Sequence, residues 1–128
     1  MHVKAKKGLG QHFLKDQNIA RKIVDALSWD QDDTVIEIGP GTGVLTKFLL
    51  EKNCNLKLIE IDNESIEFLK QTYPESVDSI VEKDFLKLDL TDFNSKSLII
   101  IGNFPYYISS QIFFKILEHK DIVFETVG

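Results

Sequence analysis

The chain alternates between short, continuously apolar runs and stretches in which apolar residues recur every three or four positions. Short apolar runs are typical of buried β-strands, whereas the three-to-four spacing is typical of amphipathic helices. Strands are predicted at residues 34–38, 55–62, 79–83, 97–101 and 122–127. Helices are predicted before and between them, at residues 17–27, 44–51, 64–73 and 110–117. This alternation predicts an α/β domain in which right-handed crossovers connect the strands of a parallel sheet.

Individual residues support these boundaries. Asp16 is expected to cap the first helix, because its carboxylate can accept from a free backbone N–H. The apolar positions of that helix are Ile19, Ile23, Val24 and Leu27. Pro74 is expected to end the third helix, since proline has no N–H to donate. An irregular stretch is expected at residues 84–90.

Composition and charge narrow the class of protein. Hydrophobic residues make up 43% and charged residues 27% of the 128, which is ordinary for one globular domain. The apolar runs are too short to cross a bilayer, and no apolar segment follows the Lys-rich start as in a signal peptide. We therefore expect no membrane segment and a cytoplasmic location. The single cysteine, Cys54, excludes an internal disulfide and a Cys-based zinc site.

Charge is distributed unevenly along the chain. Residues 1–28 carry six basic and two acidic residues, whereas residues 29–128 carry nine basic and eighteen acidic ones. We therefore divide the chain into a basic N-terminal segment with its helix (1–28) and an acidic body (29–128). A basic segment can follow the phosphates of a nucleic acid, and Lys4, Lys6 and Lys7 are the candidates for such contacts. A solvated tail is the alternative, and charge alone does not decide between the two.

A glycine-rich turn follows the first predicted strand. Gly39, Gly41 and Gly43 allow positive φ angles and let a ligand approach the backbone where a Cβ would clash. The next helix adds free N–H groups at its start. Val44 occupies a position that does not complete the G-x-G-x-x-G pattern of dinucleotide-binding proteins. A nicotinamide or flavin dinucleotide is therefore the weaker interpretation.

Two acidic residues stand where the next two strands are predicted to end. Glu60 lies 21 positions after Gly39, and an acid at about that distance typically accepts hydrogen bonds from ribose hydroxyls. Asp84 follows the third predicted strand, where a carboxylate can accept from an adenine amino group. Because parallel strands end at one edge, the glycines and acids together predict a site for a nucleoside-bearing ligand.

The fourth predicted strand runs into residues whose chemistry suits an adenine amine. The lone pair of that amine is delocalised into the ring, so a site that accepts its N–H hydrogens directs the lone pair at a methyl donor. The amide oxygen of Asn103 is one acceptor, and a carbonyl near Phe104, stiffened by Pro105, is the other. Tyr106 offers a face for stacking an extruded base. For Tyr107 alone we favour a place in the core.

Three segments resemble one known family. Asn-Phe-Pro-Tyr at 103–106 resembles the N-[LIF]-P-Y signature of methyltransferases that act on adenine amines in nucleic acids. Residues 37–46 resemble the cofactor loop of the ribosomal RNA adenine dimethyltransferases. Residues 7–16 resemble the N-terminal segment that packs over the cofactor in that family. The motifs stand in the family's order and span nearly the whole chain.

This resemblance implies a class I, Rossmann-like methyltransferase fold and S-adenosylmethionine as cofactor. It also implies transfer of two methyl groups to N6 of each of two adjacent adenosines near the 3′ end of small-subunit (16S) ribosomal RNA, during small-subunit biogenesis. Neither a metal nor a covalent enzyme intermediate is implied. The implied cofactor contacts are His12, Leu14, Gly39, Glu60, Asp84 and Asn103, with Gly41 and Gly43 in the same loop. The target adenine is implied to lie among Asn103, Phe104, Pro105 and Tyr106.

Some features depart from the family. His12 stands where the family usually has Asn, and Tyr107 stands where Asn is common. The family also continues past residue 128 with two further strands and a small helical domain that helps to hold RNA. We therefore expect an incomplete domain, poor RNA methylation by this chain alone, and self-association through an exposed fifth strand.

Other functions stay open at this point. An Erm-type enzyme acting on large-subunit ribosomal RNA shares all three motifs. A non-catalytic binding module that kept the methyltransferase fold is a second alternative. A nicotinamide-dependent oxidoreductase is the least favoured.

Overall fold

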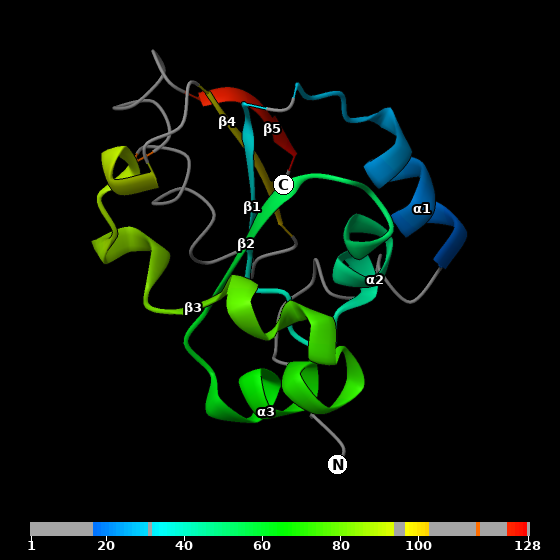
Figure 1. Cartoon of the computed structure of the whole chain (residues 1–128), viewed down its shortest axis with the longest axis vertical. Coiled ribbons are helices and arrows are strands. Elements are labelled where there is room, and N and C mark those ends of the chain that lie inside the picture. The colour runs from blue at the N-terminus through cyan, green and yellow to red at the C-terminus, as the bar shows by residue number, and fades with distance from the viewer. Residues whose placement is uncertain (1–16, 31, 94–96, 103–114, 116–122, 128) are drawn as a thin grey trace.

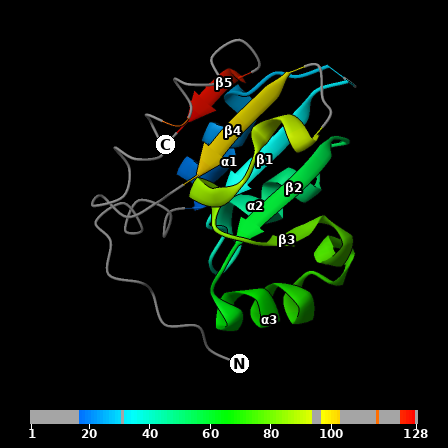
Figure 2. The same cartoon turned by 90° about the vertical axis from the view of Figure 1, so that its left-hand side faces the viewer.

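A parallel sheet is the framework of this protein, whose computed structural model describes residues 17–30, 32–93, 97–102, 115 and 123–127. The described sheet has five strands in the order β3-β2-β1-β4-β5, which can be followed across Figure 2. The strands are β1 (Thr34–Ile38), β2 (Asn55–Glu60), β3 (Ile80–Glu82), β4 (Leu98–Gly102) and β5 (Val123–Val127). The helices are α1 (Gln17–Ala26), α2 (Val44–Leu50) and α3 (Asn63–Thr72), and the 3₁₀ turns are η2 (Pro74–Ser79), η3 (Phe85–Lys87) and η4 (Leu90–Phe93).

The strand order reverses direction at β1. From β1 the chain adds β2 and β3 on one side, and then β4 and β5 on the other. Ile38, the last residue of β1, pairs with Ile59 of β2 and with Gly102 of β4. The carboxyl ends of these three strands are therefore level with one another. Open parallel sheets of this kind bind ligands beyond the carboxyl ends, at the point where the strand order reverses.

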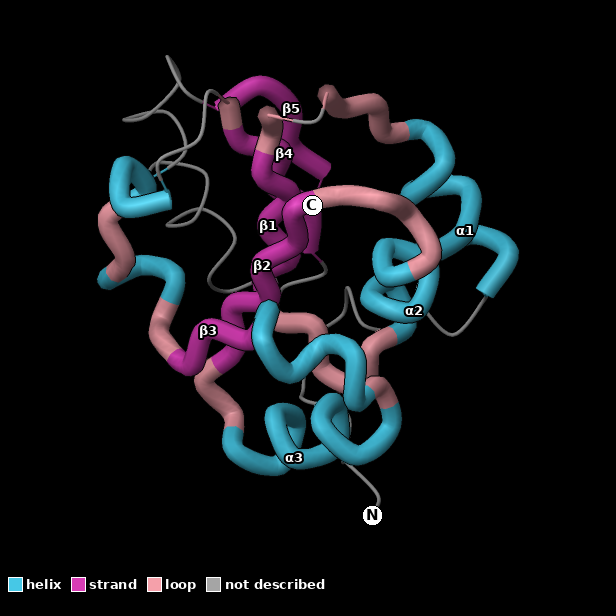
Figure 3. Tube along the Cα trace, viewed as in Figure 1, coloured by secondary structure: helices cyan, strands magenta, loops and turns pink. Residues whose placement is uncertain are grey.

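The two faces of the sheet bury separate sets of apolar side chains. Figure 1 shows α1 and α2 on one side of the sheet and the 3₁₀ turns η3 and η4 on the other, and the tube in Figure 3 shows the strands stacked between them. Val35 of β1 packs with Leu49 of α2 and Val24 of α1. Ile36 of β1 points to the opposite face, where it packs with Phe85. Both strand faces are covered, which explains why the strands are apolar without alternation.

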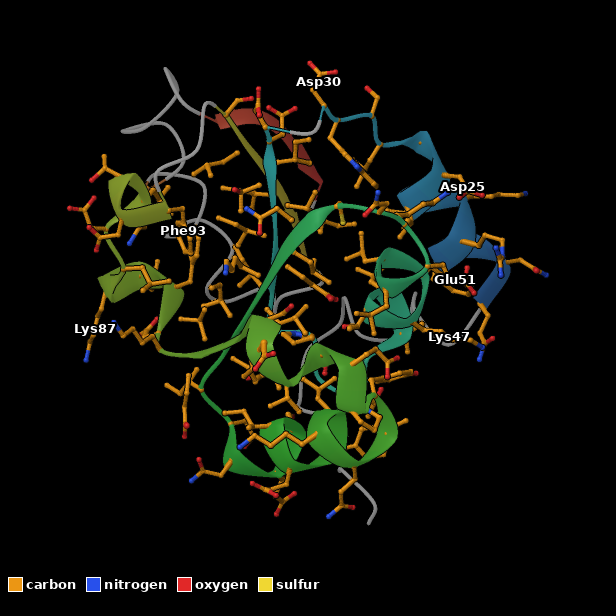
Figure 4. All side chains as sticks on the ribbon, in the orientation of Figure 1. Asp25, Asp30, Lys47, Glu51, Lys87 and Phe93 are labelled. Atoms are coloured by element: carbon orange, nitrogen blue, oxygen red, sulfur yellow. The ribbon has the colours of Figure 1, made fainter. Side chains whose placement is uncertain are left out.

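Surface contacts add to the packing of α1 against α2. Arg21 lies with its guanidinium 4.5 Å from the centre of the Phe48 ring and 3.5 Å from the Glu51 carboxylate. Lys52 approaches Asp25 at 2.9 Å. Asp25 and Glu51 are labelled on these helices in Figure 4. Arg21 is one of the six basic residues of the N-terminal segment. Its charge is therefore used in contacts within the protein. The division of the chain at residues 28 and 29 stays a prediction.

The predicted strands and the first three predicted helices are present, with small differences at their ends. The prediction that Ile19 lies on the apolar face of the first helix was wrong. Ile19 is 40% exposed, whereas Ala20 is fully buried, because the helical repeat through Val24 turns position 20 toward α2 and position 19 away from it. The irregular stretch after Asp84 forms η3 and η4. The Asp16 cap lies outside the described residues, and of the fourth predicted helix only Lys115 is described, in helical conformation.

Two further sequence-based expectations concern surfaces. Among the residues that the structure describes, no helix is both long and apolar enough to span a bilayer. β5 forms one edge of the described sheet, next to β4. Self-association through that strand stays a prediction.

Candidate functional site

The turn between β1 and α2 lies at the reversal point of the sheet. Its start is fixed to the neighbouring strand, since the Gly39 N–H donates to the carbonyl of Ile59 at 2.9 Å. Its end is fixed by the first turn of α2, where the Lys47 N–H donates to the carbonyl of Gly43 at 2.9 Å. Backbone hydrogen bonds therefore hold both ends of the glycine-rich turn.

The three glycines of this turn have different surroundings. All three have positive φ, at 62° for Gly39, 57° for Gly41 and 83° for Gly43. A Cβ built on Gly39 meets no atom within 4 Å, and one built on Gly41 meets only the Gly39 carbonyl at 3.9 Å. A Cβ on Gly43 would lie 2.7 Å from the Tyr73 ring. Space for a ligand is therefore found over Gly39 and Gly41, whereas Tyr73 covers Gly43.

This difference predicts that Gly43→Ala mainly destabilises the fold. Positive φ and the clash with Tyr73 together are expected to lower the free energy of unfolding by about 2 kcal/mol. Gly39→Ala, the matched control, has the φ cost but no clash and is expected to lose only about 1 kcal/mol. Urea unfolding of both variants measures the difference. Equal losses would show that Tyr73 yields easily to the added methyl group.

Glu60 connects the end of β2 to the glycine-rich turn. One carboxylate oxygen accepts from the Gly41 N–H at 3.1 Å. The other accepts from the N–H groups of Ile61 at 2.9 Å and Asp62 at 3.1 Å. The side chain is only 7% exposed. The structure thus brings Glu60 and Gly41 together. Three donors fix the carboxylate, whose Oε1 atom can still accept from one hydroxyl group.

Ile61, the residue after Glu60, is a candidate ligand contact that the sequence analysis missed. Ile61 is 63% exposed, although it is a large apolar side chain that directly follows β2, an interior strand of the described sheet. Asp62, which follows it, is occupied with Ser65, whose N–H donates to it at 3.0 Å at the start of α3. The sequence did contain a signal for this contact, namely an apolar residue between two acids at a predicted strand end. Ile61 offers an apolar surface next to the Glu60 carboxylate.

Asp84 stands at the same edge of the sheet. It follows β3, which pairs with β2 through Glu82 opposite Glu60. Its carboxylate accepts from the Leu86 N–H at 3.0 Å, which caps η3. The next residue, Phe85, is buried under the sheet and anchors the turn. Asp84 and Glu60 therefore lie at the ends of adjacent strands, as the sequence predicted from parallel topology.

Beneath the turn lies a carboxyl group to which the sequence analysis gave no role. Glu37 of β1 is 2% exposed, and the hydroxyl group of the fully buried Thr46 donates to it at 2.5 Å. Burial raises the pKa of Glu37 to about 8, the Thr46 hydrogen bond opposes this shift, and the charge of Glu60 adds to it. A glutamate within an otherwise apolar strand was the available signal. Glu37 is therefore protonated at neutral pH in the free protein.

The Glu37 proton makes stability depend on pH. The folded state holds this proton more tightly than the unfolded chain, so the stabilisation is complete below about pH 4.5 and is lost as pH rises through about 8. Between these values Glu37 contributes a slope of up to about 1.4 kcal/mol per pH unit. Glu37→Gln is neutral at every pH and is expected to remove that slope. Urea unfolding at pH 5, 6.5 and 8 measures it.

The control for this prediction is Glu64→Gln, which changes an exposed glutamate on α3. That variant is expected to keep the slope of the unchanged chain. Curves for the unchanged chain and Glu37→Gln that run parallel from pH 5 to pH 8 would contradict a buried, protonated Glu37.

Comparison with known proteins places this arrangement in a family. The family model described as ribosomal RNA adenine dimethylase matches residues 2–127. This chain belongs to that family. The ribosomal RNA small subunit methyltransferase A of Flavobacterium johnsoniae is 55% identical over 127 residues, which are 98% of this chain and 49% of the relative. The protein of that name from Cytophaga hutchinsonii is 52% identical over 128 residues, covering 98% and 50%.

Two solved structures share the fold of this chain. A dimethyladenosine transferase from Plasmodium falciparum has a TM-score of 0.66 and 32% identity, covering 84% of this chain and 39% of that one. The 23S rRNA methyltransferase ErmE has a TM-score of 0.67 and 28% identity, covering 80% and 41%. The resemblance to the dimethyltransferase family and the Rossmann-like methyltransferase fold are therefore confirmed. The chain spans about half the length of the curated relatives it matches.

Several predicted site residues of this adenine dimethylase family member lie outside the described residues. They are Lys4, Lys6, Lys7, His12, Leu14, Asn103, Phe104, Pro105, Tyr106 and Tyr107. Their roles stay predictions. β4 ends at Gly102, level with Ile38, so the chain leaves the sheet at the edge where the glycine-rich turn begins. Among the described residues, no group of three or more His, Cys, Asp or Glu side chains is arranged to hold a metal ion.

Proposed function

We propose that this chain is the cofactor-binding part of a cytoplasmic enzyme that methylates ribosomal RNA. The reaction is transfer of methyl groups from S-adenosylmethionine to N6 of two adjacent adenosines near the 3′ end of small-subunit ribosomal RNA, during assembly of that subunit. The observation that carries this proposal is the hydrogen bond from Gly41 to Glu60, beside the open space over Gly39. It places an acid suited to binding ribose hydroxyls next to open backbone at the reversal point of the sheet.

The described residues fit the parts of S-adenosylmethionine. Glu60 supplies an acceptor for the ribose hydroxyls, and Asp84 one for the adenine amino group. Ile61 supplies an apolar surface against which an adenine ring can lie. The open backbone at Gly39 leaves room for the methionine part.

Electrostatics favours this cofactor over a dinucleotide. The described residues place the Glu60 carboxylate beside the glycine-rich turn and the Asp84 carboxylate after β3, at the same edge of the sheet. A sulfonium with an α-ammonium group is attracted by carboxylates, whereas the pyrophosphate of a dinucleotide is repelled by them. The acidic site therefore agrees with the sequence, which also favoured S-adenosylmethionine over a nicotinamide cofactor.

The chemistry needs positioning more than acid or base catalysis. When bound, S-adenosylmethionine supplies an electrophilic methyl group on a positively charged sulfur. In our proposal the amide oxygen of Asn103 accepts an N–H of the target adenine amine, which directs its lone pair at that methyl group. Tyr106 stacks on the extruded base, and Pro105 stiffens the carbonyl of Phe104 as the second acceptor. Lys4, Lys6 and Lys7 contact RNA phosphates. Alignment of the reactants then provides most of the rate gain.

Calorimetry tests the cofactor part of the proposal. The purified chain is expected to bind S-adenosylhomocysteine, the stable product of the cofactor, and to show no heat with NAD. Binding of NAD in preference to S-adenosylhomocysteine would refute the proposed cofactor.

A labelling experiment tests the RNA part. Unmodified small and large ribosomal subunits are incubated with the chain and methyl-labelled S-adenosylmethionine, and labelled positions are mapped. Label is expected at adjacent adenosines of the small-subunit RNA, at a low rate, because the chain spans about half the length of its relatives. Label confined to large-subunit RNA would support an Erm-type function instead.

A further inference from the structure

A lysine far along the chain bonds to the turn that begins at Asp84. The ammonium group of the half-buried Lys115 donates to the carbonyl of Phe85 at 2.6 Å, and also to the carbonyl of Leu88. It lies 5.2 Å from the centre of the Phe85 ring. Phe85 is 4% exposed. The lysine therefore binds both main-chain atoms and the buried ring of one short segment.

This turn has a carboxylate at its start and an ammonium group at its end. The Asp84 side chain accepts from the Leu86 N–H, and its carbonyl accepts from the Lys87 N–H at 2.9 Å. At the other end, the carbonyls of a helical turn lack intrahelical donors and carry partial negative charge. The Phe85 carbonyl already accepts from the Leu88 N–H at 3.2 Å. The Lys115 ammonium adds a second donor there, bonds to the Leu88 carbonyl, and brings the opposite charge to the end of the turn.

The attachment of the turn to the sheet explains why such a bond matters. The turn follows β3, which pairs over only three residues and has β2 as its single neighbour in the described sheet. A short edge strand fixes the segment that follows it less firmly than a central strand does. Lys115 comes from the chain between β4 and β5, on the other side of the reversal point. Its bonds therefore connect the Asp84 turn to a residue that follows β4 in the chain.

We propose that Lys115 is a positioning residue for adenine recognition, holding the turn so that the Asp84 carboxylate faces the adenine amino group. This inference rests on the proposed binding of S-adenosylmethionine. Lys115 acts through the main-chain carbonyls of Phe85 and Leu88. Its loss is expected to affect the adenine amino contact more than the rest of the ligand.

The test compares two ligands that differ at one position. S-adenosylhomocysteine carries the adenine amino group, and S-inosylhomocysteine carries an oxygen in its place. In the purified chain, Lys115→Met is expected to weaken the adenine ligand about tenfold, as expected for a lost charge-assisted hydrogen bond. The affinity for the inosine ligand is expected to change by less than about twofold. Lys115→Arg, which keeps charge and donors, is expected to restore most of the preference for adenine.

The matched control is Lys87→Met on the same turn. Lys87 is exposed, and Figure 4 shows it on the outer side of the turn. Its replacement removes the same charge and is expected to change neither affinity. Thermal unfolding of each variant confirms that the fold is kept. If Lys115→Met does not fold, Lys115→Gln, which removes the charge and can donate to at most one carbonyl at a time, is expected to show a smaller loss of affinity, again for the adenine ligand alone.

The outcomes separate this inference from the proposed function. If Lys115→Met lowers the affinity for both ligands equally, the role of Lys115 is merely structural and the inference is overturned. Unchanged affinities would overturn it as well. If the unaltered chain binds neither ligand, the proposed function itself fails.

Discussion

Replacing Asn103 with Ala is expected to lower the rate of methyl transfer about 100- to 1,000-fold, the usual effect of removing one preorganised hydrogen-bonding partner. The adenine amine is a poor nucleophile because its lone pair is delocalised, and the Asn103 oxygen is the proposed acceptor that counters this. β4 ends at Gly102, which pairs with Ile38, the last residue of β1 before the glycine-rich turn. Single-turnover labelling of small subunits measures the rate.

Cofactor binding separates catalysis from folding in this experiment. Calorimetry with S-adenosylhomocysteine is expected to show less than about a tenfold loss for Asn103→Ala, since one uncharged hydrogen bond is removed. Asn55→Ala is the control, because Asn55 lies at the amino end of β2, where it donates to Thr34 at 2.9 Å. An unchanged rate in Asn103→Ala would show that Asn103 is not the acceptor that activates the amine, whereas no transfer by the unaltered chain would point to a binding module without catalysis.

Glu60→Ala is expected to weaken the binding of S-adenosylhomocysteine about 10- to 100-fold, because a charge-assisted hydrogen bond to a ribose hydroxyl is lost. It also leaves the N–H groups of Gly41, Ile61 and Asp62 without their acceptor. We therefore expect the free energy of unfolding to fall by at least about 2 kcal/mol. Calorimetry and urea unfolding measure the two effects separately.

Glu82→Ala provides the control for this second prediction. Glu82 pairs in register with Glu60 across the sheet but is exposed. Its replacement is expected to change neither the affinity nor the stability. Tight ligand binding by Glu60→Ala would remove the ribose contact from the proposed site.

The sequence by itself determined the order of the elements and the edge at which the site lies. Gly39, Gly41 and Gly43 directly follow one apolar run, and Glu60 ends the next. These are local patterns, and parallel topology then brings strand ends together without further information. The turn at Gly39 and the acid at Glu60 were therefore placed correctly relative to each other before the structure was considered.

Only the tertiary structure decided which of these residues face a ligand and which face the protein. Tyr73 covers Gly43 and leaves Gly39 open, although the local sequence treats both glycines alike. Glu37 is enclosed beneath α2 and retains its proton, and Lys115 reaches a turn about thirty residues away in sequence. Burial and contacts across the sheet depend on how segments far apart in the sequence pack together. The local spacing of residues therefore cannot predict them.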